Sequence, residues 1–281
     1  MIEFLIEPFE AEFVRNGVYA AALVGVLSGV VGCFVVLRGL ALMADSLAHG
    51  VIPGIAIAFI ITAGSTGGDA SDAAITVGAL VAGLVTAGAT SLILRRSRLR
   101  EETAAAVVFV LMLALGVALI SSVEGYTVDL TAFLFGNVLG VTSDEIVVTA
   151  ALTVAVLLAV AVLYRPFLLI SFDRQRAAAL GLRVDALHLL MLVTITVAIV
   201  VGFRVVGALL VLGMLMAPPA AAALLTRRLP TMMVVSAGIA AASAPIGLLI
   251  SWHLDIAAGA SIVLVAVAAF VVVLAVQPSP R

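Results

Sequence analysis

Long hydrophobic runs recur along this chain and constrain its fold more than any other feature of the sequence. They lie over residues 17–37, 40–62, 74–94, 103–120, 145–163, 187–203, 205–225, 231–250 and 260–276. A helix needs about 20 apolar residues to cross the hydrocarbon core of a bilayer, and each run is close to that length. We therefore predict an all-α, polytopic integral membrane protein with about eight to nine transmembrane helices.

The composition supports a lipid environment. Of the 281 residues, 64% are hydrophobic and 11% are charged, which is too little polar surface to coat a water-soluble globule. We expect one transmembrane domain over residues 1–281, surrounded by membrane lipids, with an amphipathic surface segment at residues 1–16. The net charge of −2 does not favour nucleic-acid binding. The single cysteine, Cys33, excludes a disulfide framework and a cysteine metal cluster.

The basic residues predict which loops face the cytoplasm. All 14 basic residues are arginines, and most fall into three groups separated by pairs of hydrophobic runs. These groups are Arg95, Arg96, Arg98 and Arg100, then Arg165, Arg174, Arg176 and Arg183, then Arg227 and Arg228. Because cytoplasmic loops are enriched in arginine and lysine, we expect all three groups on the cytoplasmic face. The opposite loops are acidic and would attract cations or basic partners.

Two segments depart from the pattern of simple spans. Residues 125–140 contain a short apolar stretch that is too short to cross the bilayer, so we predict a re-entrant or partial helix there. Residues 171–185 are too polar for the bilayer and predict a short helix closed by Gly181. Its size and charge are those of a segment that docks into a soluble cytoplasmic partner.

Asp45 and His49 are the most informative polar residues because they lie inside an apolar span. Ionisable side chains within a membrane are costly and usually functional. Their i, i+4 spacing places a carboxylate and an imidazole on one helix face, where both can bind one divalent cation. Two alternatives remain open: the pair relays protons in a secondary transporter, or it only hydrogen-bonds neighbouring helices.

Two other histidines are candidates for lesser roles. We expect His188, next to the basic loop, to lie at the membrane interface. His253 and Asp255 follow the eighth hydrophobic run on the acidic face, where they are candidates for the place at which a metal ion enters.

Motifs for enzymatic chemistry are absent from the sequence. The chain contains neither HExxH nor GxSxG. A nucleotide-binding loop of the form GxxxxGK[ST] is also excluded, because the chain has no lysine. We predict that the protein is not an enzyme and that any ATP hydrolysis occurs on another chain.

Five stretches of this sequence resemble the ABC-3 family, the metal permeases of ATP-binding-cassette importers for manganese, zinc and iron. They are LRGLALMADSLAHGVIPGIAIAF (37–59), DLTAFLFGNVLGVTSDE (129–145), FDRQRAAALGLRV (172–184), VVGALLVLGMLMAPPAAAALL (205–225) and LDIAAGASIVL (254–264). The first is the most specific, because it matches the family pattern of an aspartate, a histidine four residues later, and then Pro-Gly.

The resemblance implies a function and a set of partners. Asp45 and His49 would coordinate a passing Mn²⁺, Zn²⁺ or Fe²⁺ ion, with no permanently bound cofactor. Residues 172–184 would form the cytoplasmic coupling helix, in which the family's pattern covers Phe172, Asp173, Arg174, Arg176, Ala179 and Gly181. The family implies a homodimer in the bacterial cell membrane. Its partners would be two cytoplasmic ATPase subunits that hold ATP and an extracytoplasmic metal-binding protein.

Overall fold

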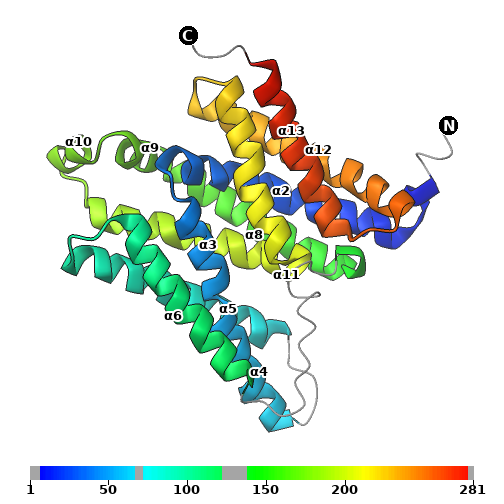
Figure 1. The fold of residues 1–281 in the computed structure, drawn as a ribbon, viewed down its shortest axis with the longest axis horizontal. Coiled ribbons are helices and arrows are strands. Elements are labelled where there is room, and N and C mark those ends of the chain that lie inside the picture. Colours follow the sequence, from blue (N-terminus) through cyan, green and yellow to red (C-terminus); the bar gives the residue numbers. More distant parts are fainter. Residues whose placement is uncertain (1–6, 67–71, 122–137, 278–281) are drawn as a thin grey trace. The chain divides into compact units, whose positions relative to one another are not determined.

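The computed structural model describes residues 7–66, 72–121 and 138–277, and this part of the chain is helical and contains no β-strand. The helices are α2 (Glu12–Arg38), α3 (Ala41–Gly50), α4 (Ile52–Thr66), α5 (Asp72–Arg96), α6 (Glu101–Ser121), α8 (Ser143–Val162), α9 (Tyr164–Phe172), α10 (Arg174–Ala179), α11 (Val184–Leu225), α12 (Leu229–Leu254) and α13 (Ala258–Val276), with a 3₁₀ turn at Val138–Gly140 (Figure 1). The predicted all-α class is confirmed.

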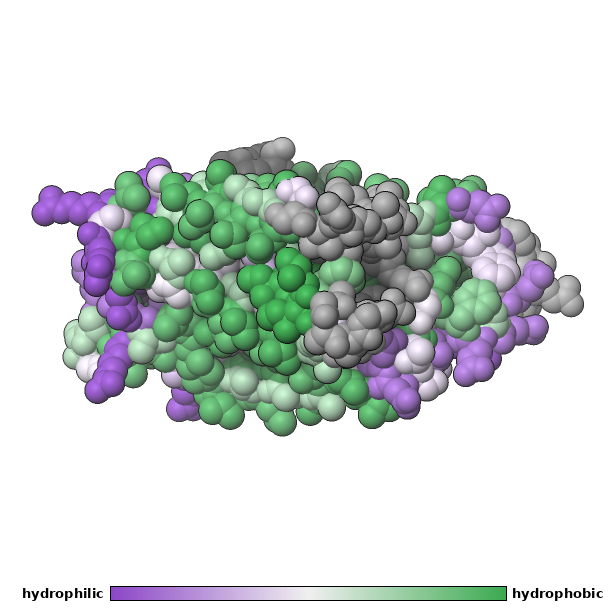
Figure 2. Space-filling view, turned by 90° about the horizontal axis from the view of Figure 1, so that it is seen from below, coloured by the Kyte–Doolittle hydropathy of each residue, from purple (hydrophilic) through white to green (hydrophobic). Residues whose placement is uncertain are grey.

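Eight helical segments of the described chain are long and apolar enough to cross a membrane. Helices α3 and α4 together form one of them, Ala41–Thr62, and the first part of α11 forms another, Val184–Phe203. A shorter apolar helix follows at Leu210–Leu225. Figure 2 shows that hydrophobic side chains cover much of the visible surface, as expected for a protein that faces lipid. The prediction of about eight to nine transmembrane helices is therefore confirmed.

Helix α11 is kinked at Gly207. This residue has φ 79° and ψ 166°, a conformation that is open to glycine but strained for other residues. A Cβ atom on Gly202 would come within 2.6 Å of a methyl group of Val211, so the segments before and after the break lie against each other. The sequence predicts this boundary at residues 202–204, a few residues early. Pro218 and Pro219 lie further along, inside the helical part.

The predicted re-entrant helix over residues 125–140 lies almost wholly outside the described residues. Only its end is described, as the 3₁₀ turn at Val138–Gly140. Helix α8 begins directly afterwards with a capping box. The Thr142 backbone N–H donates to Glu145 Oε2 at 2.9 Å, and the Glu145 N–H donates to Thr142 Oγ1 at 3.4 Å. Of the predicted amphipathic segment 1–16, residues 7–10 are helical, residues 12–16 form the beginning of α2, and the first six lie outside the described part.

The chain groups into two compact units. The first consists of Met1–Leu37, Asp129–Ala161 and Val201–Arg281, and the second of Arg38–Val128 and Val162–Val200. In the first unit α12 and α13 pack side by side (Figure 1). A buried hydrogen bond from Ser236 Oγ to the Gly29 carbonyl, at 2.8 Å, joins α12 to α2. Small residues and hydroxyl bonds of this kind hold helices together in lipid, where burial of apolar surface supplies no driving force. The expectation of one domain over residues 1–281 stays a prediction.

The second unit packs α4, α5 and α6 against one another, with α3 beside α5 and α6 (Figure 1). Helices α4 and α5 approach most closely at Gly54 and Gly78, where an added Cβ on either residue would collide with the backbone of the other. The Cβ of an alanine at Gly116 in α6 would similarly meet the side chain of Ile52. Helix α4 follows α3 in the same membrane span, and its position is therefore fixed by contacts with both α5 and α6.

Candidate metal centre

Asp45 and His49 lie on α3, and a break in the helix follows them directly. Helix α3 ends at Gly50 and α4 begins at Ile52, with Val51 between them. Pro53 has no backbone N–H, so it cannot make the helical hydrogen bond to the carbonyl of His49. The break thus removes one internal bond of the span beside the polar pair.

The side chains of Asp45 and His49 face each other. His49 Nδ1 lies 3.3 Å from Asp45 Oδ1 and 3.1 Å from the Asp45 backbone carbonyl oxygen. Both oxygens are acceptors, so Nδ1 must carry the hydrogen and donate it. In the neutral ring this leaves the lone pair on Nε2, which is the state in which histidine binds a metal. His49 is therefore oriented through Nδ1, as metal-binding histidines are when a backbone carbonyl or a carboxylate accepts from their second ring nitrogen.

Neighbouring helices orient this pair. The ring of Phe109, on α6, meets the His49 ring edge-on, with the ring centroids 5.2 Å apart and an interplanar angle of 82°. Thr86 of α5 donates to the Gly50 carbonyl at 3.4 Å, and the absence of a side chain at Gly50 lets Thr86 approach this closely. The side chains of His49 and Asp45 remain 25% and 35% exposed within this chain. The site is thus fixed by packing on one side and open on the other.

The described residues bring together no group of three or more histidine, cysteine, aspartate or glutamate side chains that would hold a metal ion. Asp45 and His49 supply one carboxylate and one imidazole, which are ligands suited to manganese, iron and zinc. Two protein ligands alone make a weak site. Such a site suits a transport pathway, in which the ion must leave as readily as it enters.

His253 and Asp255 lie on either side of Leu254, the last residue of α12. Helix α12 ends at Leu254, and Asp255 adopts a left-handed conformation with φ 52°. Asp255 lines a pocket of about 570 Å³ together with Ser251 and Trp252, but His253 is not among the residues lining it. A role for either residue where a metal ion enters stays a prediction.

The predicted coupling segment 172–184 contains a shorter helix than the sequence indicates. Phe172 ends α9, Val184 begins α11, and between them only Arg174–Ala179 form a helix, α10. Asp173 caps α10, because its Oδ1 accepts a hydrogen bond of 2.8 Å from the Arg176 backbone N–H.

The end of α10 is a Schellman motif. The N–H of Leu182 donates to the Ala177 carbonyl at 3.1 Å, and that of Gly181 to the Ala178 carbonyl at 2.9 Å. The stop at Gly181, with φ 79°, is where the sequence predicts it. Ala177 is buried, whereas Phe172 and Leu180 are 70% and 63% exposed, so apolar and basic side chains of this segment are free to contact a partner.

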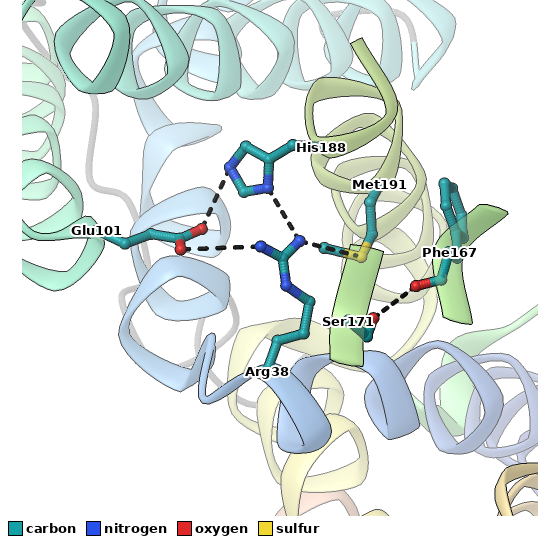
Figure 3. Close-up of polar contacts among 6 residues, drawn as sticks. All are labelled: Arg38, Glu101, Phe167, Ser171, His188 and Met191. Carbon is teal, nitrogen blue, oxygen red and sulfur yellow. Dashed lines mark hydrogen bonds and ion pairs between the residues drawn. The ribbon is translucent and has the colours of Figure 1, made fainter. Parts of the chain in front are cut away.

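Sequence reasoning missed a polar cluster at the end of α2. His188, which we expected at the membrane interface, is instead buried beside Arg38 and Glu101, with its side chain 5% exposed (Figure 3). Arg38 also contacts the sulfur of Met191, at 3.7 Å. Arg38 and His188 are 150 positions apart in the chain, and no local pattern connects them.

Known proteins resemble the chain over nearly its full length. Residues 10–277 match the model of the ABC 3 transport family. "Manganese transport system membrane protein MntC" of Halalkalibacterium halodurans is 40% identical over 254 residues, which are 90% of this chain and 84% of that protein. "Probable iron transport system membrane protein" of Haemophilus influenzae is 33% identical over 98% of this chain and 97% of its own length.

A solved structure is similar in fold and in sequence. It is "PsaBC from Streptococcus pneumoniae in complex with Fab", which has a TM-score of 0.84 and 34% identity and covers 99% of this chain and 97% of its own. Eight apolar helices and the family match agree on a multi-pass protein of the bacterial plasma membrane. The chain belongs to the ABC 3 transport family and is the membrane-spanning permease of an ATP-binding-cassette transporter.

Proposed function

We propose that this permease carries a divalent transition metal into the cytoplasm by alternating access, and that the ion passes through a transient site at Asp45 and His49. The observation that carries the proposal is the orientation of His49. Its Nδ1 is bonded to Asp45, so Nε2 is the nitrogen available to a metal. The pair lies within the membrane span Ala41–Thr62, where ionisable side chains are retained for function.

Manganese or iron is the metal that we propose. The relatives with similarity over most of this chain carry names of manganese or iron transport proteins. Carboxylate oxygen suits Mn²⁺ and imidazole nitrogen suits Fe²⁺, and the donor set itself does not exclude Zn²⁺. Protein sites select metals by geometry and availability as well as by affinity. The ion is therefore identified by measuring which metal the wild-type importer takes up best.

A second copy of the chain would complete the coordination. One chain provides two side-chain ligands, and a symmetric dimer with the two pairs facing each other would provide two carboxylates and two imidazoles. The exposure of Asp45 and His49 within a single chain is consistent with a shared site.

The energy for transport would come from two cytoplasmic ATPase subunits. This chain has no lysine and hence no nucleotide-binding loop, so ATP would be bound by those partners. We propose that the segment 172–184 docks into them through Phe172, Asp173, Arg174, Arg176, Ala179 and Gly181. On the opposite face, an extracytoplasmic metal-binding protein would deliver the ion.

Reconstitution of the permease with its ATPase and binding protein in liposomes tests the proposal. Uptake of Mn²⁺, Fe²⁺ and Zn²⁺ would be compared for wild type, Asp45→Ala and His49→Ala, with Asp185→Asn as a matched control. Asp185 is an exposed carboxylate that pairs with Arg95 far along the chain from α3. We expect uptake to be lost in both site variants, with assembly and ATP hydrolysis retained, and to be unchanged in the control.

Two outcomes would contradict the proposal. Normal uptake by both site variants would show that the ion takes another path. Uptake that needs no ATP and follows a pH gradient would indicate a proton-coupled secondary transporter, a mechanism that the family match does not favour.

A further inference from the structure

Three helix ends meet in a buried polar network that the proposed metal path does not use (Figure 3). Arg38 is the last residue of α2, Glu101 is the first residue of α6, and His188 lies one turn into α11. The side chains of Arg38 and His188 are 6% and 5% exposed, and that of Glu101 is 26% exposed. Buried charges persist in proteins only when they are paired, so these residues depend on one another.

The contacts determine how the three side chains are connected. Arg38 approaches His188 Nδ1 at 3.0 Å and, through its other terminal nitrogen, Glu101 Oε2 at 3.9 Å. Arginine can only donate, so His188 Nδ1 must be the acceptor and the ring hydrogen must be on Nε2. Nε2 lies 3.2 Å from Glu101 Oε1, a close contact in which the two atoms make no hydrogen bond, and neither atom has another hydrogen-bond partner in the described chain. Each residue therefore contacts both others in a closed ring.

This arrangement excludes a second metal site at the same place. Glu101 and His188 are the same pair of ligand types as Asp45 and His49. However, Arg38 occupies one imidazole nitrogen, and the other nitrogen carries the ring hydrogen, so it has no lone pair for a metal. A guanidinium this close would also repel a metal cation.

The network lies between the coupling segment and the helix that carries the metal pair. On one side, α10 ends at Ala179, and a short turn through Gly181 leads to α11, in which His188 is one turn from the start. On the other side, only Gly39 and Leu40 separate Arg38 from α3. Gly39 has φ 66°, so the chain turns sharply here and a shift of Arg38 passes directly to the first turn of α3.

Space for such a shift exists beside the network. A pocket of about 170 Å³ is lined by residues from the end of α2 to the first turn of α3 and by residues at the start of α6: Arg38, Gly39, Leu40, Met43, Arg100, Glu101 and Glu102. This volume lies directly between the start of α3 and the start of α6. A closed ring of three partners beside an open volume can open and re-form, unlike a packed apolar contact.

We infer that Arg38, Glu101 and His188 form a latch that transmits movement of α10 to the start of α3 during transport. They are positioning residues, because they act on Asp45 and His49 through α3 and do not touch the ion. The inference rests on the proposed function, in which ATPase subunits move α10. Breaking the contacts of the latch would uncouple ATP hydrolysis from the movement of α3.

The test is the number of ATP molecules hydrolysed per metal ion transported, measured in liposomes that contain the complete importer. The latch variants are Arg38→Gln, Glu101→Gln and His188→Gln. Arg95→Gln is the matched control, because it removes an exposed arginine–carboxylate pair, 3.8 Å from Asp185, between α5 and the same end of α11. A surface pair contributes little, so the control should keep the wild-type ratio.

We expect each latch variant to hydrolyse roughly two- to thirtyfold more ATP per ion, the range found when residues along a coupling network are changed. A purely structural role would reduce hydrolysis and uptake together and leave this ratio unchanged, which would overturn the inference. If wild type transports no metal with ATP, the proposed function itself fails. A normal wild type with normal ratios in all three variants refutes only the latch.

Hydrogen exchange decides the case of a variant that does not assemble with the ATPase. In the full-length permease, Arg38→Gln should speed amide exchange at residues 41–50, which form α3, relative to Arg95→Gln. Equal exchange in the two variants at these residues would overturn the inference.

Discussion

His49 has one ring nitrogen, Nε2, that is available to a metal, because Asp45 occupies the other, Nδ1. The Asp45 backbone carbonyl accepts from Nδ1, and the Asp45 carboxylate lies 3.3 Å from the same nitrogen, so the ring is held in one tautomer and one orientation. Phe109 fixes the same ring from α6. The two residues therefore have different roles, although both are possible ligands by residue type. His49 supplies a nitrogen ligand, whereas Asp45 orients the imidazole ring and supplies negative charge.

Substitution of each residue should distinguish these two roles. His49→Gln removes the nitrogen ligand, and we expect metal uptake to be abolished at all metal concentrations tested. Asp45→Asn keeps an acceptor for Nδ1 but loses the charge, and we expect about a 10- to 100-fold loss of metal affinity. The concentration dependence of radiolabelled Mn²⁺ uptake gives both results. An Asp45→Asn variant with wild-type affinity would show that the charge of Asp45 takes no part in binding.

Close helix contacts surround the site at the scale of elements. At the Gly54–Gly78 contact, an added methyl group meets backbone atoms, which cannot rotate away as a side chain would. Thr86 makes the equivalent close approach at Gly50. Helices α3 and α4 are thus placed by residues that have no side chain, and the geometry of the metal pair depends on them.

Gly54→Val should disturb this placement. Overpacking in a close contact costs typically 1–3 kcal/mol, and here the neighbour is a carbonyl oxygen of Gly78. We expect the free energy of unfolding, measured by denaturant titration in mixed micelles, to fall by about that amount. Gly88→Ala on α5 is the control, because no atom outside its own helix turn lies within 4 Å of the added Cβ. A loss in both variants would indicate sensitivity to any change in these helices.

Gly181→Ala tests the turn after α10. Its φ of 79° lies in the left-handed region, which costs a residue with a Cβ roughly 1–2 kcal/mol. We expect the Schellman motif to open and the binding of the ATPase to weaken, with the metal pair unaffected. Affinity between purified permease and ATPase is the measurement. Tighter or equal binding would show that the left-handed turn is not needed for docking.

The arrangement of charges is a property of the whole molecule. Arg95, Arg96, Arg98 and Arg100 lie between α5 and α6, and Arg227 and Arg228 lie between α11 and α12. Asp255 lies between α12 and α13, at the other end of α12. The positive-inside tendency then assigns the arginine loops to the cytoplasm and Asp255 to the outer face.

Cysteine labelling in intact cells checks this orientation. In a Cys33→Ser background, Arg98→Cys and Arg227→Cys should react with a membrane-impermeant maleimide only after the cells are permeabilised. Asp255→Cys should react without permeabilisation, because its loop faces outward. Cys33 is buried in α2, so its replacement removes no accessible thiol. Labelling of all three positions from one side would refute the proposed orientation.

Features that depend on neighbours in the sequence were determined by the sequence alone. Hydropathy is a local property, and it predicted the membrane spans to within a few residues. The i, i+4 spacing of Asp45 and His49 meant that they would share a helix face once the span was helical. The stop at Gly181 followed from the conformational freedom of glycine, and the overall likeness of the motifs indicated the family.

Features that depend on distant neighbours were decided only by the tertiary structure. The kink at Gly207 could not be predicted, because hydropathy does not distinguish this glycine from the others in the same apolar stretch and does not report φ. The tautomer of His49 and the pocket that Asp255 lines depend on side-chain contacts. The ring of Arg38, Glu101 and His188 joins three helix ends that are far apart in the chain. Burial of an ion pair is a property of packing, and only the folded chain brings those residues together.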